Sequence, residues 1–156
     1  MASTWILVAD AARARLFEPA PTDGRLVEIE CFTNPEGRAG ARQVDPHHPP
    51  IVKESAGAGR YEVEPHQSAR ERTANRFAHA LSEALERGRT RRRYERLVLV
   101  APPRFLGALH QHLSEPLLNS IAGELRRDLT TLGPTDLRAR LPQRLLPRKQ
   151  LAGAAT

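Results

Sequence analysis

The sequence predicts an α/β domain in which a mixed β-sheet is flanked by helices. Residues Leu97 to Val100 form an unbroken apolar run, which is typical of a strand buried on both faces. Pro102 and Pro103 cannot extend that strand, but they suit the first turn of a helix, so a strand passes directly into a helix. The start of the chain, in contrast, holds short apolar segments joined by a turn signal, which favours antiparallel strands.

Three strands are expected at the start of the chain. Thr4 to Ala9 is apolar enough to be buried on both faces, and Ala14 to Glu18 and Arg25 to Phe32 follow it. Asp23-Gly24 is a favourable hairpin turn because glycine tolerates a positive φ. These segments predict an antiparallel meander.

A long loop and a long helix are expected next. Residues 33–67 contain five prolines and four glycines, which predicts a long irregular connection. Ser68 and Glu71 have the spacing of a capping box, so a helix is predicted to begin there. An apolar stripe runs through this helix to Leu85, and Gly88 is predicted to end it.

The last third of the chain alternates short helices with one more strand. Ser114 is predicted to cap a short helix that runs to Gly123, and Leu125 to Thr130 is predicted as a partly polar strand. Gly133 precedes a further short helix, and residues 142–156 are predicted to be a basic, disordered tail. The order of strands and helices over residues 1–141 is that of a ribonuclease-H-like mixed sheet in a single domain.

Composition indicates a soluble globular protein. Hydrophobic residues make up 40% and charged residues 27% of the 156 positions. Trp5 to Ala9 is too short for a signal-peptide core or a membrane span, and the single cysteine, Cys31, excludes an internal disulfide. We therefore expect a cytoplasmic protein with no cofactor and no metal.

The positive charge is concentrated in two places. The formal net charge is +6, and the tail contributes three positive charges through Arg144, Arg148 and Lys149. A second group is a candidate nucleic-acid contact, because guanidinium groups bind phosphates. It consists of Arg87, Arg89, Arg91, Arg92, Arg93 and Arg96. The alternative is that this run is simply a solvated helix end and loop.

A second candidate site lies where the buried strands end. Its residues are Asp10, Arg13, Arg104 and Asp128, which follow or flank predicted strands at the ends where ligands commonly bind. Two carboxylates raise the possibility of a metal-dependent nuclease, but that chemistry needs three or four carboxylates around two divalent ions. The alternative is structural, with Asp10 capping a turn and Asp128 pairing with a neighbouring arginine.

Three segments resemble the bacterial host attachment proteins, proteins required for attachment to host cells. They are Trp5 to Phe17, the Val98 to Leu109 junction and Arg127 to Thr130, in the same order as in that family. The resemblance spans most of residues 4–141. It implies the α/β fold derived above, and the family name implies a role in bacterial attachment.

That family is in turn similar to the middle domain of archaeal and eukaryotic peptide-chain release factors. In those proteins a Gly-Gly-Gln loop precedes a long helix and enters the ribosomal peptidyl-transferase centre. Gln67 and Ser68 match that motif, but Pro65 and His66 replace its glycines and cannot copy their backbone angles. The resemblance implies ribosome or RNA contact rather than peptide release. The candidate contacts are Gln67, Ser68, Arg70, Arg72 and Arg76. Alternatively, Gln67 is only a polar residue before a helix cap.

We therefore expect a non-enzymatic interaction or accessory protein that associates with the ribosome or RNA. The alternative is a divalent-metal-dependent nuclease or other hydrolase that acts at the strand ends. A structural or adhesive surface role is a third reading, and it would require export.

Overall fold

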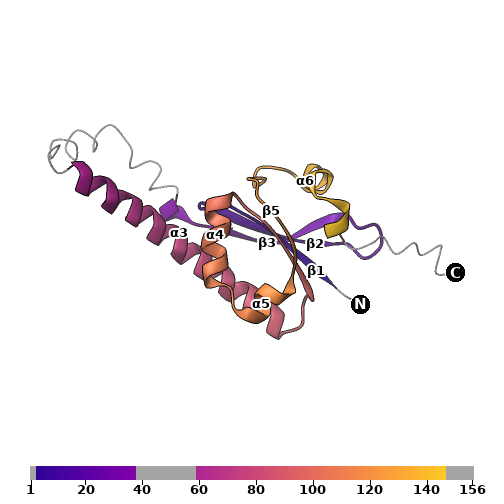
Figure 1. Cartoon of the computed structure of the whole chain (residues 1–156). Helices are drawn as coiled ribbons and strands as arrows, with labels where there is room; N and C mark the ends of the chain where they lie inside the picture. Colours follow the sequence, from indigo (N-terminus) through magenta and orange to yellow (C-terminus); the bar gives the residue numbers. More distant parts are fainter. Residues whose placement is uncertain (1–2, 38–58, 147–156) are drawn as a thin grey trace.

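The chain folds around one five-stranded mixed sheet, seen in the computed structural model in Figure 1. The structure describes residues 3–37 and 59–146, and for residues 59–68 it describes the backbone alone. The strand order is β3-β2-β1-β4-β5. The strands are β1 (Thr4–Ala9), β2 (Arg13–Pro19), β3 (Leu26–Thr33), β4 (Arg96–Val100) and β5 (Ile121–Leu125). β1, β2 and β3 pair antiparallel, whereas β4 lies parallel to β1 and β5 parallel to β4, so the predicted meander and mixed sheet are confirmed.

Helices cover both faces of the sheet. They are α3 (Gly59–Thr90), α4 (Pro103–His112), α5 (Glu115–Ser120) and α6 (Pro134–Arg140), followed by a short 3-10 helix at Gln143–Leu145. α3, α4 and α5 lie on one face and α6 on the other, and the first part of α3 projects beyond the sheet (Figure 1). None of the described helices is both long enough and apolar enough to span a membrane.

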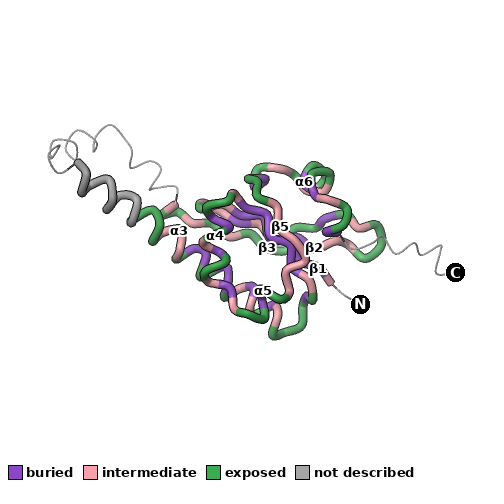
Figure 2. The backbone as a smooth tube through the Cα atoms, in the orientation of Figure 1, coloured by how far each residue is buried: buried purple, intermediate pink, exposed green. Residues whose placement is uncertain are grey.

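The central strands separate two hydrophobic cores. Every residue of β1 is buried, and successive side chains point to opposite faces. Trp5 and Leu7 therefore pack with α3 and α4, while Ile6 and Val8 pack with α6. Figure 2 shows the buried residues concentrated in the middle of the sheet. This double burial explains why an apolar run without alternation predicted β1 correctly.

The start of α3 differs from the prediction. The helix begins at Gly59 and not after Ser68, so Ser68 lies inside the helix and is not its N-cap residue. Arg60 to Glu64 contains no turn signal, and Arg and Glu are good helix formers, which explains the longer helix. The predicted loop over residues 33–67 is therefore wrong for residues 59–67, and residues 38–58 lie outside the described residues.

The end of α3 also differs. Gly88 does not end the helix, which continues to Thr90. A Cβ atom at position 88 would lie 2.5 Å from the ring of Trp5, so glycine is needed here for close packing and not for a turn. The chain leaves the helix at Arg92 instead, whose φ is 56°.

The segment after α4 is the third correction. Ser114 caps a helix as predicted, and its hydroxyl accepts a hydrogen bond from the Leu117 amide. Ile121, however, already belongs to β5, so the predicted helix to Gly123 and the predicted strand at Leu125 to Thr130 are both wrong. Gly123 lies in this strand, and a Cβ there would lie 2.1 Å from the Leu145 side chain. Glycine in a strand often marks such a close approach, so here it makes room for Leu145.

The helix after Gly133 is confirmed as α6. Leu145 and Leu146, which the sequence analysis placed in the tail, are buried with α6 in the second core. The packed part of the chain therefore reaches Leu146, and residues 147–156 lie outside the described residues.

Candidate functional site

The two ends of the sheet carry different chemistry. The carboxyl ends of the parallel strands β1, β4 and β5 meet at one edge, which we call the carboxyl edge. Asp10, Arg104 and Asp128 lie beyond these strand ends. At the opposite edge α3 ends and β4 begins. We call residues 87–93, which make this connection, the arginine turn. The candidate site at the strand ends and the candidate arginine cluster therefore lie at opposite ends of the sheet.

The backbone of the arginine turn has the geometry of a Schellman motif. The Arg93 amide donates to the Gly88 carbonyl at 2.9 Å, and the Arg92 amide donates to the Arg89 carbonyl at 3.0 Å. This pair of hydrogen bonds closes a helix through one left-handed residue, which is usually glycine. Here that residue is Arg92, with φ 56°. A left-handed conformation costs a residue with a Cβ roughly 1–2 kcal/mol.

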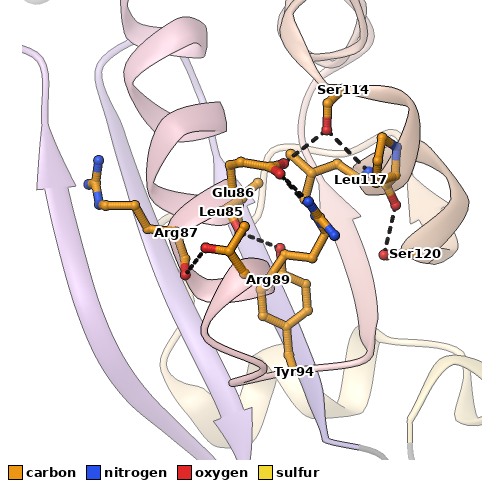
Figure 3. A network of polar contacts seen from close by, with 10 residues as sticks. Leu85, Glu86, Arg87, Arg89, Tyr94, Ser114, Leu117 and Ser120 are labelled. Atoms are coloured by element: carbon orange, nitrogen blue, oxygen red, sulfur yellow. Dashed lines mark hydrogen bonds and ion pairs between the residues drawn. The ribbon is translucent and has the colours of Figure 1, made fainter.

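A polar network fixes the base of this turn, as Figure 3 shows. Glu86 accepts hydrogen bonds from Arg89 and, at 2.9 Å, from the Ser114 hydroxyl. These contacts join the end of α3 to the start of α5. The bonds from Arg89, and then from Ser114, lower the pKa of the Glu86 carboxyl, while the bond to Glu86 raises the pKa of Arg89. Both groups are thus held in their charged forms.

Two aromatic rings support the turn from below. Tyr94 stacks on Trp5 with ring centroids 4.4 Å apart, and its hydroxyl donates to the Leu85 carbonyl at 2.5 Å. Burial raises the pKa of the Tyr94 phenol well above its ordinary value, with a smaller contribution from the charge of Glu86. The Ser3 hydroxyl donates to the Arg93 carbonyl at 2.8 Å, so the beginning of the described chain also holds the turn. The turn is therefore fixed from several sides.

The six predicted arginines separate into two groups. Arg89 is neutralised by Glu86, and Arg96 is half-buried in β4 opposite Thr4. The other four side chains are exposed, and none of them makes an ion pair with another residue of the described part of the chain. They are Arg87, Arg91, Arg92 and Arg93. The structure therefore presents four guanidinium groups on seven residues of rigid backbone.

At the carboxyl edge, the candidate residues Asp10 and Asp128 come together through Thr130, which is not among the predicted site residues. Asp10 Oδ1 accepts the amides of Ala12 and Arg13, both at 2.8 Å, so Asp10 caps the turn between β1 and β2. The buried Thr130 hydroxyl lies 3.1 Å from Asp10 Oδ2 and 2.7 Å from Asp128 Oδ1. The spacing Asp128-x-Thr130 is that of an Asx turn, which is the one signal in the sequence for this contact.

Of the two arginines in this candidate site, Arg13 contacts the pair through its backbone amide, which donates to Asp10. Arg104 is exposed on the first turn of α4 and makes no polar contact with other described side chains. Asp128 accepts from Thr130, and no ion pair with an arginine is seen among the described residues, in contrast to the structural alternative. Arg15 is the arginine that reaches this edge, because it donates to the carbonyls of Thr130 and Leu132.

The predicted loop-helix contacts lie on the projecting part of α3. The side chains of Gln67 and Ser68 are outside the described residues. Arg70 and Arg72 are exposed, and Arg76 pairs with Glu36 at 3.0 Å. An open cavity of about 460 Å³ lies beside this ion pair. It is lined by Thr33, Asn34, Pro35, Glu36, Arg76, Phe77 and Ala80.

A comparison with protein families identifies the family of this chain. The model of a family described as "protein required for attachment to host cells" matches residues 5–141. The chain belongs to this host attachment family. No curated protein matches the chain.

The family match covers both candidate regions of this host attachment family member. Its range of residues 5–141 includes the arginine turn, Asp10, Asp128 and Thr130. It ends at Leu141, the last buried residue before the 3-10 helix. Both ends of the sheet are therefore parts of the family domain.

Proposed function

We propose that this host attachment family protein is a non-enzymatic accessory protein that binds RNA, including ribosomal RNA, through the arginine turn. The observation that carries the proposal is the set of four exposed guanidinium groups without acidic partners among the described residues. Such groups contact phosphate oxygens, which give nucleic-acid binding most of its affinity without reading sequence.

The number of exposed arginines sets how steeply the affinity for RNA is expected to fall with salt concentration. Each phosphate neutralised on a duplex contributes about −0.9 to the slope of log affinity against log salt. Four contacts therefore give a slope of roughly −3.6, which is about a hundredfold loss of affinity between 50 and 200 mM salt. This steep dependence separates phosphate binding from apolar docking.

One further feature supports RNA as the polyanion. The match of Gln67 and Ser68 to the release-factor loop does not, because both residues lie inside α3 and not in a loop before it. The strand order β3-β2-β1-β4-β5 supports the ribonuclease-H-like arrangement, which occurs in many proteins that act on nucleic acids.

The nuclease alternative receives less support from the carboxyl edge. Asp10 and Asp128 converge, but their oxygens already accept the amides of Ala12 and Arg13 and the amide and hydroxyl of Thr130. Within residues 3–37 and 69–146, no three metal-ligating side chains come together. This donor set does not fit a site for two divalent ions.

The test is a salt titration of RNA binding by the full chain. Fluorescence anisotropy with a labelled ribosomal RNA hairpin is measured from 50 to 300 mM KCl for the wild type and two triple variants. One variant carries Arg91→Gln, Arg92→Gln and Arg93→Gln. The control carries Arg126→Gln, Arg140→Gln and Arg144→Gln, which removes the same charge from exposed positions away from the turn.

The expected result is a slope near −3.6 for the wild type and the control, and a slope smaller in magnitude by about 2.7 for the arginine-turn variant. Circular dichroism checks that both variants fold. Absence of binding at 50 mM salt, or equal loss in the two variants, would overturn the proposed function.

A further inference from the structure

We infer that the arginine turn takes base-paired RNA in preference to single-stranded RNA. This inference rests on the proposed function, because it concerns the form of RNA that the same four arginines contact. It follows from what lies beneath the turn, from how the turn is held and from the backbone of Arg92.

The aromatic rings closest to the turn are not available for stacking on bases. Trp5 and Tyr94 are 5% and 3% exposed and stack on each other, and the Tyr94 hydroxyl is bound to the Leu85 carbonyl. Proteins that bind single strands generally place successive bases on exposed aromatic side chains. The turn therefore offers guanidinium groups without a stacking surface, which suits a ligand whose bases are already stacked in a helix.

The turn is also held rigidly before any ligand binds. The backbone bonds from Arg92 and Arg93 and the Ser3 contact fix the backbone positions from which the guanidinium groups project. The Glu86–Arg89–Ser114 network holds the end of α3 beside them (Figure 3). Because the backbone is set before binding, only the arginine side chains lose conformational entropy when they contact the phosphates of a duplex that is itself already ordered. A single strand must instead be ordered on binding, which lowers its affinity.

Arg92 gives an independent indication that charge at the tip of the turn matters. It occupies the left-handed position of the Schellman motif, where glycine is the less strained residue. When a residue adopts an unfavourable backbone conformation, that outlier supports the hypothesis that the residue has a function. Arg92 is exposed, so its side chain adds a fourth cation beside Arg87, Arg91 and Arg93.

The experiment compares one RNA sequence in its two forms. Affinity of the full chain is measured by anisotropy at 100 mM KCl for a duplex of about 16 base pairs and for each of its separated strands. The strands are chosen to lack internal pairing. The same measurements are made on Arg92→Gly and on a control, Arg140→Gln, whose side chain is exposed on α6.

We expect the duplex to bind about tenfold more tightly than either strand. Arg92→Gly is expected to reduce the salt slope for the duplex by about 0.9, whereas the control leaves it unchanged. Equal or tighter binding of the single strands, with the arginine dependence retained, would overturn this inference and leave the proposed function in place. Binding that is insensitive to all turn arginines would overturn the proposed function itself.

Discussion

The Thr130 hydroxyl lies 3.1 Å from Oδ2 of Asp10, although 120 positions separate the two residues in the sequence. The same hydroxyl is 2.7 Å from Oδ1 of Asp128. Because a hydroxyl has one hydrogen, it donates to only one of these carboxylates at a time. The contact joins the loop after β1 to the loop after β5, and so it fixes the carboxyl edge.

Replacing Thr130 by valine is expected to lower the free energy of unfolding by about 1–2 kcal/mol, since it keeps the volume but leaves two carboxylates without this donor. Urea denaturation measures the change. The control is Thr131→Val, because Thr131 is exposed and its substitution is expected to change stability by less than about 0.5 kcal/mol. Equal effects of the two substitutions would show that the hydroxyl contact contributes nothing.

Two glycines in helices are expected to respond in opposite directions to alanine. At Gly88 the added Cβ would lie 2.5 Å from the Trp5 ring, so Gly88→Ala is expected to cost about 1–3 kcal/mol despite the better helix propensity of alanine. At Gly107 in α4 nothing lies within 4 Å of the added Cβ, so Gly107→Ala is expected to stabilise by about 0.5–1 kcal/mol. Thermal denaturation followed by circular dichroism tests both, and stabilisation by Gly88→Ala would contradict the packing argument.

Arg92→Gly is expected to stabilise the fold while it weakens RNA binding. Glycine removes the cost of the left-handed conformation. Because glycine also has greater conformational freedom in the unfolded chain, part of this gain is lost, and the net gain in stability is about 0.5–1 kcal/mol. Urea denaturation measures the gain. The control Arg91→Gly lacks the positive φ and is expected to give no gain. A loss of stability in Arg92→Gly would mean that its side chain makes contacts that outweigh the strain.

Glu86 is expected to make stability depend on pH in the acid range. Its pKa is lowered in the folded protein by Arg89 and then Ser114, so its stabilising contribution is present at neutral pH. That contribution is lost as the pH falls below about 4, through the lowered folded-state value. Urea denaturation of Glu86→Gln and the wild type is therefore expected to show a larger difference at pH 7 than at pH 3.

The control for this prediction is Glu95→Gln, because Glu95 is exposed and has no ion pair within the part of the chain that is described. Its difference from the wild type is expected to be small at both pH values. A Glu86→Gln difference that does not change between pH 7 and pH 3 would contradict the role of the lowered pKa.

The strands that are marked by an unbroken apolar run were predictable from the sequence. β1 and β4 are apolar runs buried on both faces, and their observed bounds agree with the predicted ones to within one residue. The prediction of a hairpin turn at Asp23-Gly24 is confirmed by the positive φ of Gly24, 71°. In these places local preference and tertiary packing favour the same structure.

The errors arose where tertiary contacts decide the structure. Gly88 and Gly123 have the local pattern of helix ends, but one gives space to Trp5 and the other to Leu145. Arg92 has no glycine signal, although it takes the conformation that glycine prefers. No pattern local to Asp10 indicates that Thr130 is its partner. The candidate arginines were visible in the sequence. The sequence did not show that Arg89 is the one that pairs with Glu86, which lies just before the predicted cluster.

Arg15 links parts of the sheet that lie on either side of its own strand. Its guanidinium group binds Glu28 on β3 at 2.6 Å and also the carbonyls of Thr130 and Leu132, which follow β5. β3 and β5 form the two outer borders of the sheet, so one side chain couples regions that share no backbone ladder. Amide protons near both borders should therefore exchange with solvent in a single opening event, with matched protection factors, and should become independent once this link is removed.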